Sequence, residues 1–137
     1  MWWIYALLSA FFASLTAILA KIGISNVNSD LATAIRTIVI VVAAWSIVLL
    51  RGEQGGLPLL SKKNILFLVL SGLTTAASWL MYFKALQLGK VSQVAPVDKL
   101  SVALTIILAA VFLQEALTLK VLIGAALIIA GTIVLIL

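Results

Sequence analysis

The chain has 137 residues, of which 65% are hydrophobic, and it carries a net charge of +5 with a mean hydropathy of +1.33. This much apolar surface cannot be hidden in the core of a soluble domain of the same length, so the composition indicates an integral membrane protein. The chain has no Cys and no His, which removes thiol and imidazole chemistry and predicts no metal site, no cofactor and no enzymatic activity. The basic residues stand singly at the ends of apolar runs, which favours the lipid bilayer over nucleic acid as a partner.

Five apolar runs fill most of the chain, and each predicts one membrane-spanning helix. At ~1.5 Å per helical residue, runs of this length reach ~25 to 35 Å, which matches the hydrocarbon thickness of a bilayer. The connections are short, so we expect a single all-α membrane domain over residues 1–137. Because five is an odd number, such a unit starts on one side of the membrane and ends on the other. The predicted spans are residues 2–21, 31–50, 64–84, 91–113 and 118–137.

The first two runs differ in their polar content. The first has no acidic residue, and its Ala and Ser residues recur at four-residue spacing, which is typical of close helix packing. The second carries Arg36 a short way inside its start. An unpaired charge near the bilayer centre costs about 2.5 to 3.5 kcal/mol, so Arg36 should face protein or a water-filled cavity.

One face of the third run is polar and has a tryptophan beside it. Side chains at helical spacing share a face, so this stripe predicts a substrate cavity with an aromatic wall for an apolar or aromatic metabolite. The alternative is that the hydroxyls bond to carbonyls of their own helix and that small residues ease helix packing. The side chains concerned are Ser71, Thr74, Thr75, Ser78, Trp79 and Tyr82.

The fourth run combines a proline with a second polar stripe. Pro96 has no amide hydrogen, so it should kink or break the helix near its start, and it is a hinge candidate. Asp98, Ser101 and Thr105 follow at i, i+3 and i+7, which places them on one helix face. They are further candidates for the substrate cavity.

Two opposite charges are expected at similar depth in the membrane. Arg36 and Asp98 lie on runs that enter from the same face, and each should sit ~10 Å inside, so the two side chains could pair. The functional interpretation is a substrate or gating site. The structural interpretation is an ion pair, with Lys99 reaching back to the interface.

Loop charges give little preference for either orientation in the membrane. If the loops alternate sides, the amino-terminal face carries four basic residues and the other face three, or five when Arg36 and Lys99 are included. A chain without orientation bias is expected to insert both ways. Two oppositely inserted copies would reproduce the inverted-repeat plan of many secondary transporters. The loop residues are Arg51, Lys62, Lys63 and Lys120 on the first face, and Lys21, Lys84 and Lys90 on the second.

Several segments of the chain carry a family resemblance. They are Lys21–Ile24, Asp30–Arg36, Gly89–Asp98, Leu113–Thr118 and Ile123–Gly131, with Pro96, Glu115, Gly124 and Gly131 as the most specific positions. Together they resemble the EamA-type repeat of the drug/metabolite transporter superfamily, and most of all its short five-helix bacterial and archaeal branch. The resemblance implies half of a ten-helix inverted-repeat transporter that pairs as an antiparallel homodimer, with the cavity between the halves. The first run lacks the membrane-embedded Glu of the small multidrug resistance branch, which argues against that branch's proton-coupled mechanism.

The sequence therefore predicts a transporter of small metabolites in the cell (inner) membrane of a prokaryote. It would cross the membrane several times and work by alternating access as a dual-topology homodimer. Two alternatives stay open. One is a multidrug exporter of the same architecture, and the other is a non-transporting scaffold or partner subunit of a heterodimer.

Overall fold

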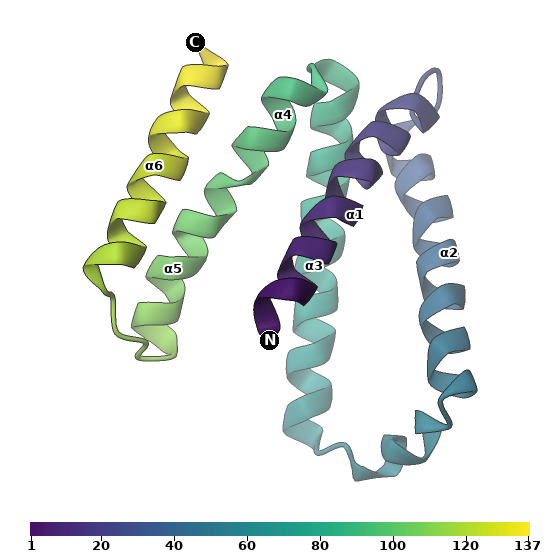
Figure 1. Ribbon diagram of the computed structural model, residues 1–137. Helices are drawn as coiled ribbons and strands as arrows, with labels where there is room; N and C mark the ends of the chain where they lie inside the picture. The colour runs from purple at the N-terminus through teal and green to yellow at the C-terminus, as the bar shows by residue number, and fades with distance from the viewer. The chain divides into compact units, whose positions relative to one another are not determined.

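The computed structural model describes all residues from 1 to 137, and every regular element in it is a helix (Figure 1). Five helical stretches are long and apolar enough to cross a membrane, which confirms the predicted number of spans. Large apolar side chains on these helices are widely exposed, as expected where lipid replaces water. The elements are α1 (Trp2–Gly23), α2 (Ser29–Leu50), the 3-10 helix η1 (Glu53–Leu59), α3 (Lys62–Leu88), α4 (Val91–Asp98), α5 (Leu100–Phe112) and α6 (Leu119–Ile136).

Short polar side chains fix where three of the helices begin. The Asn28 carboxamide oxygen accepts hydrogen bonds from the amides of Asp30 at 2.8 Å and Leu31 at 3.2 Å, which caps α2. Thr118 caps α6 in the same way through the Val121 amide. Ser61 accepts a hydrogen bond from the Asn64 amide at the start of α3. Each cap satisfies amide donors that the first helical turn leaves without a partner.

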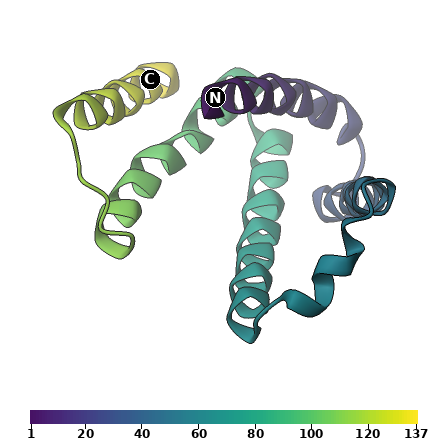
Figure 2. The same ribbon diagram turned by 60° about the horizontal axis from the view of Figure 1, so that its bottom comes forward.

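The chain divides into two compact units, and each is described here by itself. One unit is residues 19–87, and the other joins residues 1–18 to residues 88–137. In the first unit, α2 leads through Gly52 and η1 into α3 (Figures 1 and 2). Gly52 has φ +69°, a left-handed conformation that a residue with a side chain rarely adopts, so it allows the chain to leave α2 abruptly.

Two polar side chains tie the α1–α2 connection to the end of α3. The Lys21 ammonium donates a hydrogen bond to the Leu86 carbonyl, and the Gln87 carboxamide donates to the Val27 carbonyl at 2.5 Å. Phe83 and Leu86 are buried beside these contacts. Since α3 runs to Leu88, these groups belong to its last turns, and the first unit is held together at this end.

In the second unit, α5 and α6 form an antiparallel hairpin, and α4 also packs against α6 (Figure 1). The Thr132 side chain on α6 is only 3% exposed. Its hydroxyl donates to the Ile128 carbonyl at 2.8 Å and lies 3.3 Å from the Pro96 carbonyl of α4. A buried hydroxyl therefore links α6 to the proline-bearing helix.

The fourth span is broken shortly after its proline. Helix α4 ends at Asp98 and α5 starts at Leu100, and the Lys99 amide bonds to the Pro96 carbonyl three residues earlier, at 3.0 Å. Pro96 has no amide hydrogen and its ring crowds the turn before it, whereas the break lies after the proline, at Lys99. A role for Pro96 as a moving hinge stays a prediction.

Candidate functional site

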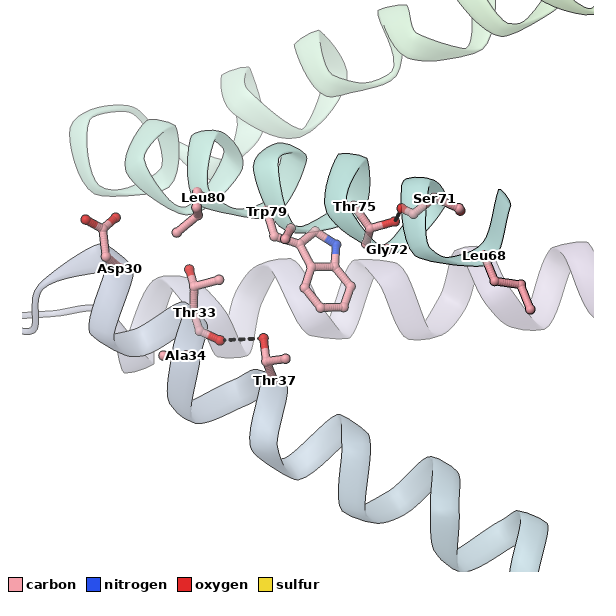
Figure 3. A pocket seen from close by; sticks show the side chains of 11 residues that line it. Asp30, Thr33, Ala34, Thr37, Leu68, Ser71, Gly72, Thr75, Trp79 and Leu80 are labelled. Carbon is pink, nitrogen blue, oxygen red and sulfur yellow. Dashed lines mark hydrogen bonds between the residues drawn. The ribbon is translucent and has the colours of Figure 1, made fainter. Parts of the chain in front are cut away.

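An open groove of about 500 Å³ lies between α2 and α3 (Figure 3). Helix α2 runs away from α3 beyond Thr37, so the two helices leave space between them. In the close-up, the Trp79 indole extends from α3 toward α2 across this space. The groove is lined by Asp30, Thr33, Ala34 and Thr37 from α2, and by Leu68, Ser71, Gly72, Thr75, Ala76, Trp79 and Leu80 from α3.

The threonine hydroxyls of the groove donate their hydrogen atoms to carbonyls of their own helices. Thr33 donates to the Ser29 carbonyl, Thr37 to the Thr33 carbonyl and Thr75 to the Ser71 carbonyl, each at 2.8 Å. These are bonds to the preceding turn of the same helix, a common arrangement for Ser and Thr in membrane helices. The hydroxyl oxygens keep free lone pairs, so these threonines offer the groove acceptors of hydrogen bonds.

Arg36 lies beside the groove and contacts one of its walls. Its guanidinium carbon is 4.3 Å from the centroid of the Trp79 ring and 5.3 Å from that of Phe83. Both are cation–π distances, and such contacts stabilise a partly desolvated guanidinium by about 0.5 to 2 kcal/mol. Trp79 thus faces the groove and also supports the cation next to it.

The candidates of the fourth span belong to the other unit. Asp98 pairs with its neighbour Lys99 across 3.3 Å, and their side chains are 36% and 58% exposed. The Thr105 hydroxyl donates to the Ser101 carbonyl at 2.8 Å, as the packing interpretation of the polar stripes expected. The expected pairing of Arg36 with Asp98 joins two units that are described separately, and it stays a prediction.

The third-helix stripe is only partly shared with the groove. Ser71, Thr75 and Trp79 line it. Ser78 and Tyr82 do not belong to its lining, and the Tyr82 ring makes an edge contact with Phe83 at 6.4 Å between centroids. The roles of these five residues in binding a substrate stay predictions.

Sequence reasoning missed the side of the groove that α2 contributes. Asp30, Thr33 and Thr37 follow at i, i+3 and i+7, so the helical spacing that identified the stripe on α3 is present here too. Asp30 lies just before the predicted span of residues 31–50, so the apolar run alone does not include it in this helix. Gly72 was also missed, and it widens the groove, since a Cβ atom at this position would meet nothing within 4 Å.

Comparisons with known proteins agree over nearly the whole chain. Residues 1–137 match a family described as the EamA-like transporter family. The chain is similar to a protein of Sinorhizobium sp named "Uncharacterized transporter in cobO 3'region", with 48% identity over 134 residues that cover 98% of this chain and 95% of that protein. No solved structure matches the chain.

Proposed function

Because the chain belongs to the EamA-like transporter family over its whole length, we propose that it carries small metabolites across the membrane by alternating access, as an antiparallel homodimer. The family and the relative named a transporter make this chain a multi-pass membrane transporter and point away from an enzyme. They also confirm the family resemblance inferred from the sequence motifs. The substrate class, the two orientations and the pairing are what we propose beyond that.

The odd number of spans is the observation that best supports the pairing of two copies. Five helices of membrane-crossing length put the two ends of one copy of the chain on opposite sides of the bilayer. Two copies inserted in opposite directions give ten helices in two inverted halves, the plan of many secondary transporters, with the binding site where the halves meet. The relative from Sinorhizobium sp supports this proposal, because the matched region covers 95% of that protein and leaves little room for a second set of five helices.

The charges at the helix ends support insertion in both orientations. Four basic residues flank the ends on the amino-terminal side and three flank the opposite ends, or five with Arg36 and Lys99 included. Orientation follows the excess of Lys and Arg in short loops, and a difference of one residue provides almost no excess. The inner membrane of a prokaryote is the proposed location, in keeping with the bacterial source of the relative.

The groove supports a small-molecule substrate. Its volume of about 500 Å³ falls within the range of roughly 300 to 1,000 Å³ that is usual for ligand pockets. The groove is open, so one copy of the chain would not seal a substrate from lipid and water. In the proposed dimer, the second copy supplies the missing wall, and rocking of the two copies exposes the site to alternate sides.

Variants locked in one orientation test the proposal. Lys at Gln54 and Gly55 adds two positive charges to η1, where a Cβ at position 55 meets open space. An oppositely biased variant carries Lys at Ser25 and Ser92, which are both exposed. A few loop charges are enough to set the direction of insertion, so each variant alone should be inactive in uptake into cells or vesicles. Expression of the two together should restore activity.

The matched control is the variant with Gln54→Asn and Gly55→Ala, which adds no charge and should behave as the wild type. Full activity from one locked variant alone would refute the antiparallel homodimer and leave a transporter of another assembly. A scaffold or partner subunit would show no uptake from either variant, from both together or from the wild type.

A further inference from the structure

The connection between α2 and α3, residues 51–61, has an apolar second half. It joins two helices of membrane-crossing length, so it lies at the surface of the bilayer. Leu59 is 84% exposed, and Leu57 and Leu60 are exposed as well. Apolar surface is stabilised by leaving water, and a group of exposed leucines marks a contact with something outside the chain.

The backbone of η1 arranges these leucines on two adjacent faces. In a 3-10 helix, residues three apart share a face. Leu57 therefore shares a face with Leu60, whose amide donates to the Leu57 carbonyl at 3.3 Å, and Leu59 lies on the next face. The third face carries Gly55, where a Cβ atom would meet open space. In Figure 2, η1 runs between the end of α2 and the start of α3, so the connection has an apolar side and a side suited to water.

Basic side chains flank the leucines at both ends. Arg51 follows α2, Lys62 and Lys63 begin α3, and all three are exposed. The acidic residue of this stretch is Glu53, so positive charge is in excess. The two lysines do not stabilise their own helix, since a helix dipole disfavours cations in the first turn. A negatively charged surface beside the connection would attract all three.

We propose that the connection between α2 and α3 binds anionic lipids, with its three leucines inserted at the boundary of headgroups and acyl chains and its three flanking basic residues against lipid phosphates. Interfacial segments of this kind insert their apolar side by about 5 to 10 Å, and apolar burial and charge attraction act together. A second copy of the chain fits less well, because the helix ends on both of its faces are basic and its net charge is +5. Lipid binding here does not depend on transport, so the two can fail separately.

The depth of position 59 tests the insertion of the leucines. The chain has no cysteine, so Leu59→Cys and the control Gly55→Cys each take one nitrobenzoxadiazole label in the purified full-length protein. Both are reconstituted into vesicles of equal parts phosphatidylcholine and phosphatidylglycerol. The label at position 59 should be quenched by nitroxides on the upper acyl chain and protected from iodide present on both sides of the membrane. The label at position 55 should show the reverse.

The preference for anionic lipid tests the charges. A nitroxide is carried at the same acyl position by either phosphatidylglycerol or phosphatidylcholine, in both leaflets, so the orientation of the copies does not affect the result. Each Lys or Arg near an anionic surface strengthens binding by about fivefold. Quenching at position 59 should therefore report an enrichment of phosphatidylglycerol of about fivefold or more, and salt at about 1 M, where the Debye length is about 3 Å, should remove it.

Removal of the flanking charges should also remove the preference. The test variant carries Arg51→Gln, Lys62→Gln and Lys63→Gln. The matched control removes three exposed lysines at other helix ends and should keep the preference. It carries Lys84→Gln, Lys90→Gln and Lys120→Gln.

Equal access of iodide to positions 59 and 55 would overturn the insertion. Protection of position 59 from both iodide and lipid nitroxides would reassign the leucines to a contact with a second copy or another protein. Equal quenching by the two lipids, or the same preference in the test variant, would overturn the role of the basic residues. Displacement of phosphatidylglycerol by inorganic phosphate, beyond the effect of sodium chloride at equal ionic strength, would reassign those residues to a soluble ligand.

Discussion

The groove of α2 and α3 and the hairpin of α5 and α6 use polar side chains in different ways. In the groove, the threonine hydroxyls bond only to their own helices, and Thr37 and Thr75 are less buried than Thr33. In the second unit, the Thr132 hydroxyl is buried and links α6 to the Pro96 carbonyl. The Thr132 hydroxyl therefore contributes to the packing of α6 against α4, whereas Thr37 and Thr75 keep acceptor positions at the groove. We therefore expect substrate contact in the first region and helix packing in the second.

Trp79→Ala is expected to have the largest effect on transport. It removes a groove wall and the ring that supports Arg36, and loss of a tryptophan at the centre of a binding site commonly costs about 2 kcal/mol, or about thirtyfold in affinity. The protein should still fold and insert. The matched control is Trp45→Ala, which changes a half-exposed tryptophan on α2 that does not line the groove. Equal losses for the two variants would break the comparison.

Overpacking of the hairpin should act on stability instead. Ala103 on α5 is 7% exposed, so Ala103→Leu has no free space and should lower the free energy of unfolding by about 1 to 3 kcal/mol. Val111→Leu is the control, because Val111 on the same helix is 66% exposed. Unfolding in mixed detergent measures both. A stable Ala103→Leu protein with impaired uptake would move substrate contact into the hairpin.

The hydroxyl of Thr132 provides a smaller and more specific test. Thr132→Val keeps the shape and removes the hydroxyl that contacts the Ile128 and Pro96 carbonyls, so it should lower the free energy of unfolding by about 1 kcal/mol. Thr105→Val removes a bond within α5 only and should change stability less. If the two variants are equally stable, the link between α6 and α4 contributes nothing measurable.

Asp98→Asn is expected to have the smallest effect. The partner of Asp98 is Lys99, and the two side chains are 36% and 58% exposed, so the pair should contribute about 0 to 1 kcal/mol. The alternative is that Asp98 neutralises Arg36. In that case Asp98→Asn would be strongly destabilising, and adding Arg36→Gln would restore folding.

The number of spans and one wall of the groove could be predicted from the sequence. Hydropathy finds helices because a span needs about 20 apolar residues, and the spacing of Ser71, Thr75 and Trp79 placed them on one face of α3. The ends of helices were harder to predict. Helix α3 extends from Lys62 to Leu88, beyond the predicted residues 64–84, because a charged residue ends an apolar run without ending the helix that carries it.

The rest of the site depends on tertiary structure. No local pattern reports that α2 diverges from α3 or that Arg36 stacks on Trp79. The polar face of α2 has the same spacing as that of α3, yet Asp30 lies in the first turn of its helix, where an acidic residue is usual for helix capping. Pro96 predicts a break in the fourth span. The position of the break, at Lys99, depends on the hydrogen bonds that the backbone forms after the proline.

The central claim is that copies of this chain lie in the membrane in both orientations. Single cysteines at Gly55 and Ser92 test it directly, because the chain has no other cysteine and a side chain at position 55 meets open space. Labelling of intact cells with a membrane-impermeant maleimide, before and after permeabilisation, measures the fraction of each site that faces outward. The account predicts that about half of the copies label from outside at each of the two positions, as balanced loop charges imply. Labelling of one position entirely from outside, and of the other only after permeabilisation, would contradict it.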